Sequence, residues 1–392
     1  MKRLMTAALA FALSFCSAEI YATENPIIHF AFTSSADDSS QYTGTPAGGA
    51  ALRALGDRQV LDLGFDGGYF DFGSSMGKVI GSLDSDFSIV TTVFVPESAQ
   101  LGQNGNFVFN FGNSSDSGYL FFGANEMRCS ITLTNWTGES TVSANRRLPQ
   151  GRWVNLAMVR RGDKGEIYLD GELLASAPVS IHPSELGMTT QNWLGRSPYG
   201  GDVMLKGARY ASFSIYNQAL ADADVASLAA AADLETLNRA TDTELINETI
   251  EAAAFDFSKV RSDVNLPTRL PNGVTGVWTS SSPDVIAADG HVNRPQAGQT
   301  DASLTLTLEA SRNEAKAVFT YPACVVALPT EEEALEFDLN SLTLKGNINN
   351  LRSSLALPTS VGECSLITWK SSDPTYINNL GQILRPAPKG EG

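Results

Sequence analysis

Two loop segments carry the residue types that bind sugars. Trp136 stands among polar residues in "LTNWTGES", and Tyr199 stands in the glycine-rich "SPYGGD". A flat aromatic ring covers the apolar face of a sugar, while a few fixed polar groups orient its hydroxyls. Arg196 directly precedes the second segment and can donate hydrogen bonds to such hydroxyls. We therefore expect a polysaccharide or glycan ligand that contacts Trp136, Tyr199 and Arg196.

Calcium is the metal that the acidic residues favour, because carboxylates and backbone carbonyls are its usual ligands. Asp202, at the end of "SPYGGD", is the expected ligand, with Asp66 and residues 36–38 ("ADD") as alternatives. The sequence contains no EF-hand loop or other dense Asp pattern, so it does not define the coordination shell.

No arrangement of residues predicts catalysis. On one strand, Glu166 and Asp170 of "EIYLDGE" would share a face about 13 Å apart, since a strand rises about 3.3 Å per residue. Glycosidases place their carboxyl groups about 5 Å apart for retention or about 6.5–9.5 Å apart for inversion. Glu172 follows the predicted turn and does not shorten this distance. The 3 histidines are far apart, which argues against a zinc site or a Ser–His–Asp triad. We expect no catalytic residue in this chain.

Charge and cysteine content exclude other classes of partner. The net charge of −16 disfavours nucleic acid and anionic lipid, both of which require a basic surface. Beyond the N-terminal segment, the cysteines are Cys129, Cys324 and Cys364, which are too few and too scattered for a disulfide framework. We expect them to be buried, unpaired thiols.

The elements that must position the loop residues are predicted β-strands. From residue 27 onward, apolar and polar residues alternate in short segments that Gly, Asn, Asp and Ser separate. The expected strands are "IIHFAF" (27–32), "FSIVTTVFV" (87–95), "NFVFNFG" (106–112), "GYLFFG" (118–123), "WVNLAMVR" (153–160) and "EIYLDGELLAS" (166–176). Asp170-Gly171 predicts a two-residue hairpin turn. With no helical segment between these strands, the fold class is predicted to be an all-β sandwich.

A change of composition comes after the strands. "ALADADVASLAAAADLETL" (219–237) is rich in Ala and Leu and predicts a short helix. "TDTE" (241–244) has the form of a capping box and predicts that a second helix begins there. We therefore place a domain boundary between the two helices, with the large sandwich at residues 23–237.

A segment near the middle of the chain occurs twice. "VWTSSSPDVIAADGHVNRP" (277–295) returns as "TWKSSDPTYINNLGQILRP" (368–386), 91 residues later. Two small sandwiches in tandem are expected, at residues 238–329 and 330–392. Trp278 recurs as Trp369 and is expected in the core, with a sugar platform as the alternative.

The two copies differ on the C-terminal side of the repeated segment. In the first copy, "ASLTLTLEASRNEAKAVFTYPACVVAL" holds its last two predicted strands, and the second copy has no such segment. Missing strands would leave sheet edges unpaired and core surface uncovered. We therefore expect an incomplete second sandwich. The alternative is a natural end, with the half-domain disordered or completed by a partner.

Two longer segments match a known family. They are "GRWVNLAMVRRGDKGEIYLDGELLAS" (151–176) and "NWLGRSPYGGDVMLKGARYASFSIYNQALADADVASL" (192–228). Here the chain resembles the laminin-G-like, concanavalin-type jelly rolls, which are common in exported bacterial glycan-degrading proteins. The resemblance implies core positions for Trp153 and Trp193. It also implies a structural role for Arg196, against the sugar contact considered above.

The repeats are similar to the atrophied bacterial Ig-like modules, whose pattern is "LP", then "W-x-S-S", then "D-G-x-V-x-R-P". The resemblance implies that they are spacers beside catalytic domains, often glycoside hydrolases of family 43 or other enzymes that cut arabinan or xylan. It therefore implies a C-terminal catalytic domain in cis, beyond residue 392.

The N-terminal segment "MKRLMTAALAFALSFCSAEIYATENP" has the pattern of a secretory signal peptide over residues 1–22. Small-residue cleavage sites end at Ala18 or Ala22. The apolar core is shorter than the roughly 20 residues that span a membrane, and no other segment approaches that length. We expect an exported protein, periplasmic, extracellular or at the cell surface. Lipid attachment at Cys16 is the alternative.

The expected function combines these elements. It is the non-catalytic N-terminal region of an exported polysaccharide-degrading protein, with a carbohydrate-binding jelly roll and Ig-like spacers ahead of a glycoside hydrolase domain. The alternative is a cell-surface adhesin or structural protein that binds a protein or a host glycan.

Overall fold

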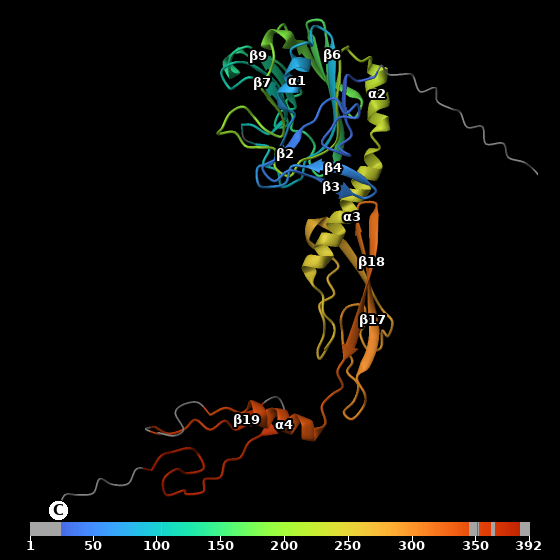
Figure 1. Ribbon diagram of the computed structural model, residues 1–392. Coiled ribbons are helices and arrows are strands. Elements are labelled where there is room, and N and C mark those ends of the chain that lie inside the picture. Colours follow the sequence, from blue (N-terminus) through green and yellow to red (C-terminus); the bar gives the residue numbers. More distant parts are fainter. Residues whose placement is uncertain (1–24, 103, 345–350, 352, 362–364, 385–392) are drawn as a thin grey trace, which may run out of the picture. The chain divides into compact units, whose positions relative to one another are not determined.

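The computed structural model describes residues 25–102, 104–344, 351, 353–361 and 365–384. It divides into two compact units between Glu244 and Leu245 (Figure 1). The predicted signal peptide, residues 1–22, lies outside the described residues, as does Cys364. No helix within the described residues is both long enough and apolar enough to cross a membrane.

The first unit contains an antiparallel sheet that has eight strands within the described residues. Its order is β13-β12-β11-β6-β15-β4-β3, with β1 also paired to β15. The strands are β1 (Ile28–Phe30), β3 (Ala51–Leu55), β4 (Arg58–Asp62), β6 (Phe87–Phe94), β11 (Trp153–Arg161), β12 (Lys164–Leu169), β13 (Glu172–Pro178) and β15 (Arg209–Tyr216). The hairpin predicted between β12 and β13 is confirmed, because Asp170 and Gly171 both have positive φ, at 51° and 85°, as a primed turn requires.

A second antiparallel sheet faces the first, with seven strands in the described part of the chain. Its order is β10-β9-β8-β7-β14-β5-β2. The strands are β2 (Thr45–Ala47), β5 (Tyr69–Asp71), β7 (Phe107–Gly112), β8 (Tyr119–Gly123), β9 (Arg128–Thr132), β10 (Ser140–Ser143) and β14 (Gln191–Leu194). The all-β sandwich predicted from alternation is therefore confirmed.

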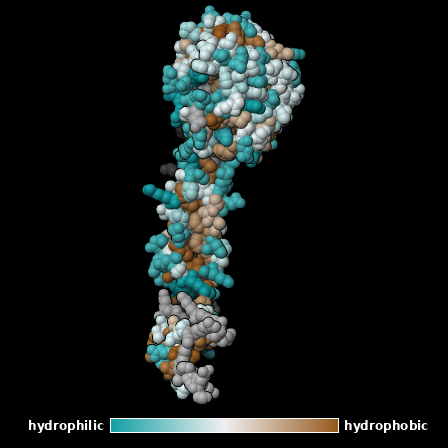
Figure 2. Space-filling view, turned by 90° about the vertical axis from the view of Figure 1, so that its left-hand side faces the viewer, coloured by the Kyte–Doolittle hydropathy of each residue, from teal (hydrophilic) through white to brown (hydrophobic). Residues whose placement is uncertain are grey.

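The core of this unit lies between the two sheets. Apolar side chains from both inner faces form one buried cluster, rich in phenylalanine. Tyr210 of β15 crosses the interior and donates its hydroxyl to the Val108 carbonyl of β7 at 2.7 Å, so its buried polar atom is paired. On the face shown in Figure 2, the surface of this unit is mostly hydrophilic, with apolar residues in small scattered patches.

One helix within the strand region was not predicted. Helix α1 (Gly73–Ile80) has two glycines and two serines, which weaken a helical signal in the sequence. Its formation depends on tertiary packing, since Met76, Val79 and Ile80 are buried. Gly77 is required there, because a Cβ at that position would lie 1.8 Å from the Thr189 carbonyl oxygen.

The prediction that a helix begins at the capping box "TDTE" (241–244) is wrong. Helix α2 (Asp222–Ala231) ends earlier than expected, and helix α3 (Leu234–Ala253) runs through this segment without a break. The break falls at Asp233, which has φ of 52°. The Thr241 hydroxyl accepts a hydrogen bond from the buried Trp153 indole at 2.9 Å instead of capping a helix. A contact between residues so far apart in sequence is invisible to a local pattern.

The second unit contains the first predicted Ig-like repeat, whose described residues form one three-stranded sheet packed with part of a helix. Its sheet consists of β16 (Thr275–Ser280), β17 (Ala302–Arg312) and β18 (Ala315–Val325), and Ile246 and Ile250 of α3 belong to its core. Trp278 is 4% exposed, and its indole donates to the Pro267 carbonyl at 3.0 Å. Its predicted core position is confirmed.

The second copy of the repeat reproduces this local structure. The Trp369 indole donates to the Pro358 carbonyl at 2.7 Å, 91 residues after the equivalent pair. Ile377 pairs with Ile383 as Ile286 pairs with Val292. The other elements described there are α4 (Glu331–Ser341), β19 (Ser360–Val361) and β20 (Ser365–Leu366).

The two cysteines in the described part of the chain are Cys129 and Cys324, and neither forms a disulfide. Cys129 is buried, as expected, whereas Cys324 is only partly buried. Burial raises the pKa of the Cys129 thiol, so that residue behaves as a small apolar side chain.

Candidate ligand-binding site

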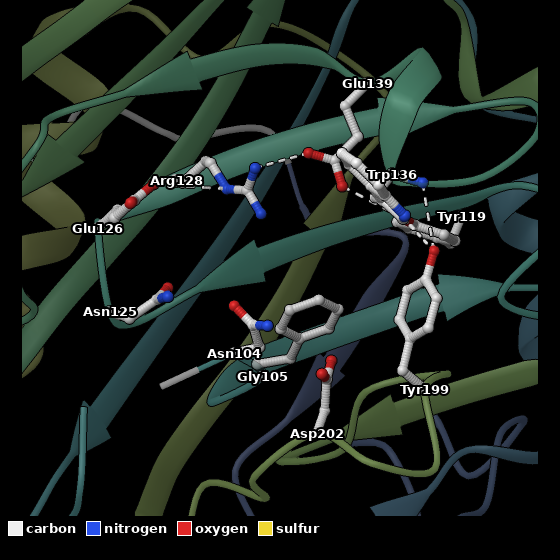
Figure 3. A pocket seen from close by; sticks show the side chains of 11 residues that line it. Asn104, Gly105, Tyr119, Asn125, Glu126, Arg128, Trp136, Glu139, Tyr199 and Asp202 are labelled. Atoms are coloured by element: carbon white, nitrogen blue, oxygen red, sulfur yellow. Dashed lines mark hydrogen bonds and ion pairs between the residues drawn. The ribbon is translucent and has the colours of Figure 1, made fainter. Parts of the chain in front are cut away.

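A pocket of about 540 Å³ lies on the outer face of the seven-stranded sheet (Figure 3). It brings together Trp136, Tyr199 and Asp202, three of the four site residues that the sequence suggested. The described residues that line it are Asn104, Gly105, Phe107, Tyr119, Asn125, Glu126, Arg128, Trp136, Glu139, Tyr199 and Asp202.

The floor of the pocket is aromatic because strands β7 and β8 alternate between two apolar faces. Leu120 and Phe122 point into the core between the sheets, whereas Tyr119 and Phe121 join Phe107 on the outer face. The rings of Phe107 and Phe121 stack with centroids 4.0 Å apart and an interplanar angle of 6°. The outer face of the sheet therefore carries a rigid apolar base.

Trp136 stands at the rim of the pocket and is 68% exposed. It begins a short 3-10 helix (Trp136–Gly138) whose first turn is capped by the Asn135 side chain, which accepts from the Thr137 amide at 3.1 Å. The Trp136 amide donates to the Tyr199 hydroxyl at 3.2 Å. The backbone is thus fixed while the indole ring remains accessible to a ligand.

The segment "SPYGGD" forms the opposite side of the pocket and is held by its own side chains. The Ser197 hydroxyl donates to Asp202 Oδ2 at 2.5 Å and accepts from the Tyr199 amide at 3.1 Å. Val203 pairs with Gly105 through a parallel bridge. Gly105 has φ of 96°, and a Cβ there would lie 2.4 Å from the Val203 carbonyl oxygen, so only glycine fits.

Arg196, the fourth residue suggested by the sequence, is not among the residues that line the pocket. Its guanidinium lies 4.5 Å from the Tyr69 ring centroid and 4.4 Å from that of Trp193. Trp193 is 9% exposed, as expected for a packed residue. A cation in contact with two aromatic rings supports the local structure. This placement agrees with the structural role that the family resemblance implied.

Glu139 and Arg128 form the main ion pair of the pocket. Arg128 Nη1 donates to Glu139 Oε2 at 2.6 Å, and the Glu139 side chain is 8% exposed. Arg128 Nε also lies 3.8 Å from a carboxylate oxygen of Glu126. The guanidinium carbon of Arg128 lies 5.0 Å from the Phe121 ring centroid, so the cation of the ion pair lies over the aromatic ring.

The Tyr199 hydroxyl joins three parts of the pocket. It donates to the Ser115 carbonyl at 3.0 Å, accepts from the Trp136 amide, and lies 3.0 Å from the Tyr119 hydroxyl. A phenol has one donor and two acceptor positions, and here the Ser115 carbonyl takes the donor and the Trp136 amide takes one acceptor, so Tyr119 can fill the third position only by donating. Figure 3 shows the Tyr199 ring pointing toward Tyr119 and Trp136.

The same hydrogen bonds bear on the protonation of Glu139. The Tyr119 hydroxyl lies 3.2 Å from Glu139 Oε1, to which it donates when that carboxyl is ionised. Tyr119 has only one proton, so it cannot then donate to Tyr199 as well. A proton on Glu139 would reverse the first bond and free the Tyr119 proton for Tyr199. Burial raises the pKa of Glu139, and Arg128 and Tyr119 oppose that rise. Burial also raises the pKa of Tyr119.

The carboxylates of the pocket all have partners. Glu139 is paired with Arg128, Glu126 lies within ion-pair distance of the same side chain, and Asp202 accepts from Ser197. Glycoside hydrolysis needs one carboxyl group to protonate the leaving oxygen and a second to attack or to activate water. This pattern of pairing suits binding better than hydrolysis.

Asp202 was also the expected calcium ligand. Within the described residues, no group of three or more His, Cys, Asp or Glu side chains lies in an arrangement that could hold a metal ion. Calcium takes six to eight oxygen ligands, and carboxylates supply much of its binding energy. The described surroundings of Asp202 therefore do not make a carboxylate-rich shell, and calcium stays a prediction.

Sequence reasoning missed the ion pair and the aromatic floor. The sequence did contain a signal for the floor, since residues alternate between the two faces of a strand and "GYLFFG" therefore places Tyr119 and Phe121 on one face. Glu139 stands in the same quoted segment as Trp136, but its pairing with Arg128 depends on how β9 aligns with β10. No local pattern defines that register.

Two family models match separate segments of the chain. Residues 81–226 match the family model described as the concanavalin A-like lectin/glucanases superfamily, and residues 241–328 match that of the atrophied bacterial Ig domain. The resemblances inferred from the sequence are thus confirmed for both segments. The search of curated proteins gives no match.

Solved structures that align with this chain come from several kinds of protein. Domain 4 of a GH43 extracellular arabinanase from Geobacillus stearothermophilus, in complex with arabinotriose, is 16% identical, with a TM-score of 0.43 over 52% of this chain and 97% of that one. A Trypanosoma rangeli sialidase is 15% identical, with a TM-score of 0.41 over 54% of this chain and 33% of the enzyme. A botulinum neurotoxin serotype D/C binding domain is 11% identical, with a TM-score of 0.43 over 75% of this chain and 73% of that one.

Proposed function

We propose that a concanavalin A-like lectin unit followed by an atrophied bacterial Ig unit serves here as the glycan-binding, non-catalytic part of an exported polysaccharide-degrading protein. The observation that carries the proposal is the pocket on the seven-stranded sheet. It combines an exposed indole at the rim, an aromatic floor and a ring of polar side chains. These are the groups that recognise a sugar ring and its hydroxyls.

Export and the role of the repeats complete the proposal. The signal-peptide pattern in the sequence supports export, and the resemblance of residues 241–328 to atrophied bacterial Ig domains supports a spacer function. On this proposal a glycoside hydrolase domain acts in cis, and the jelly roll holds that domain near its polysaccharide. The binding unit itself is not proposed to cleave the glycan.

Affinity electrophoresis tests the binding part directly. The protein is run through native gels that contain arabinan, xylan or pectin, with a gel that lacks polysaccharide as the reference. We expect at least one polysaccharide to retard it, and Trp136→Ala to restore free migration. No retardation by any polysaccharide would contradict the proposal and would favour a protein ligand, as in an adhesin. Absence of reducing-sugar release during incubation is expected, because the pocket carboxylates are paired.

A further inference from the structure

We infer that this pocket selects uncharged glycan chains and excludes glycans that carry carboxylates. The inference rests on the proposed function and concerns the class of glycan that the same site accepts. It starts from the charges that line the pocket. Three carboxylates line it, from Glu126, Glu139 and Asp202, whereas Arg128 is the single Lys, Arg or His in the described lining.

The cation is already engaged by the protein. Arg128 donates to Glu139 at 2.6 Å, lies 3.8 Å from Glu126, and has its guanidinium carbon 5.0 Å from the Phe121 ring centroid. A ligand carboxylate that paired with the remaining N–H groups of Arg128 would lie beside Glu139 and Glu126. Repulsion between these like charges would offset the gain, and displacement of Glu139, whose side chain is 8% exposed, would leave a buried carboxylate without its partner.

A ligand carboxylate would also enter a pocket that is negative before it binds. With ionised side chains, the lining carries two more negative charges than positive ones. Like charges in a partly enclosed cavity repel more strongly than on an open surface, because little water screens them. Sugar hydroxyls do not meet this penalty, since they can donate to the same carboxylates and to the amide oxygen of Asn104.

The test compares chemically matched polysaccharides. Arabinan and xylan are each prepared in three forms: unmodified, hydroxyethylated, and carboxymethylated to the same degree of substitution. The two substituents are similar in size and differ in charge. Affinity electrophoresis is run at about 0.01 M and about 1 M salt, where the Debye lengths are about 30 Å and 3 Å.

At low salt we expect the carboxymethylated form to bind at least about tenfold more weakly than the hydroxyethylated form, with a smaller difference at high salt. Glu126→Gln should narrow the difference in affinity between the carboxymethylated and hydroxyethylated forms. Glu172→Gln is the matched control, because it removes the same charge from an exposed residue outside the pocket. It should leave the discrimination unchanged.

The outcomes separate this inference from the proposed function. Equal binding of the carboxymethylated and hydroxyethylated forms would overturn the charge selection while leaving glycan binding in place. Charge selection would also be overturned if polygalacturonate retarded the protein while unmodified arabinan and xylan did not. An equal effect of Glu126→Gln and Glu172→Gln would show that net charge, and not the pocket, discriminates. A protein retarded by no polysaccharide at all would overturn both proposals.

Discussion

The Trp136→Ala variant gives the sharpest test of the pocket, because the affinity loss can be worked from exposure. Trp136 is 68% exposed, and a tryptophan side chain buries on the order of 250 Å² when it is covered fully. A sugar ring stacked on one face of the indole would remove roughly 80 Å² of its apolar area from water. At about 25 cal/mol per Å², removal of the ring should weaken binding by about 2 kcal/mol, or about thirtyfold.

The same substitution should leave folding nearly unchanged. The Trp136 amide that donates to Tyr199 belongs to the backbone and is retained in alanine. Substitution of an exposed side chain usually changes the free energy of unfolding by less than about 0.5 kcal/mol. Urea unfolding of the variant checks this expectation, and affinity electrophoresis against the retarding polysaccharide measures the loss of binding.

Phe65→Ala is the control, since Phe65 is another exposed aromatic residue, at 59%, and is not among the residues lining the pocket. It should bind as the unmodified protein does. A Trp136→Ala variant whose affinity stays within about twofold of the parent would refute the calculation, because an indole in contact with a ligand cannot be removed at so small a cost. Equal losses in both variants would refute the location of the site.

Three further predictions concern the same pocket. Tyr199→Phe removes the hydroxyl that joins its two sides, so we expect a loss of about 1–2 kcal/mol in urea unfolding together with weaker glycan retention; unchanged retention would exclude this loop from the site. Because burial raises the pKa of Glu139 above its ordinary 4.5, its favourable contribution is complete below that pH and is lost as pH rises above it. The free energy of unfolding of the parent relative to Glu139→Gln should therefore fall as pH rises above that value, and a flat difference would contradict the raised pKa. If calcium binds at Asp202, it should raise the thermal unfolding midpoint of the parent and not of Asp202→Asn; no shift in either protein would contradict the calcium prediction.

The sequence predicted the elements that depend on local pattern and failed where distant segments meet. Alternation located β6 and β8 nearly to the residue, and Asp170-Gly171 defined its turn, because strand period and turn conformation are properties of neighbouring residues. The capping box at 241–244 was misread, because the Thr241 hydroxyl is used by Trp153.

The candidate site likewise has residues that a local pattern predicts and contacts that only the fold creates. Trp136 and Tyr199 could be recognised as aromatic residues in polar loops, and the fold brings them to one pocket. Arg196 looked equivalent in the sequence, yet its guanidinium lies over Tyr69 and Trp193. The Glu139–Arg128 ion pair depends on how β9 and β10 align in the sheet, and the sequence pattern does not define that register.

The Tyr199 hydroxyl has a consequence for redesign of this unit. One phenolic oxygen contacts the Ser115 carbonyl, the Trp136 amide and the Tyr119 hydroxyl, so it joins segments that are remote in sequence. A combinatorial library for new sugar preferences should keep that tyrosine constant and diversify Asn104 and Glu126 at the margin. Variation at Tyr199 would change the arrangement of the loops around the pocket before it changed which ligand the pocket accepts.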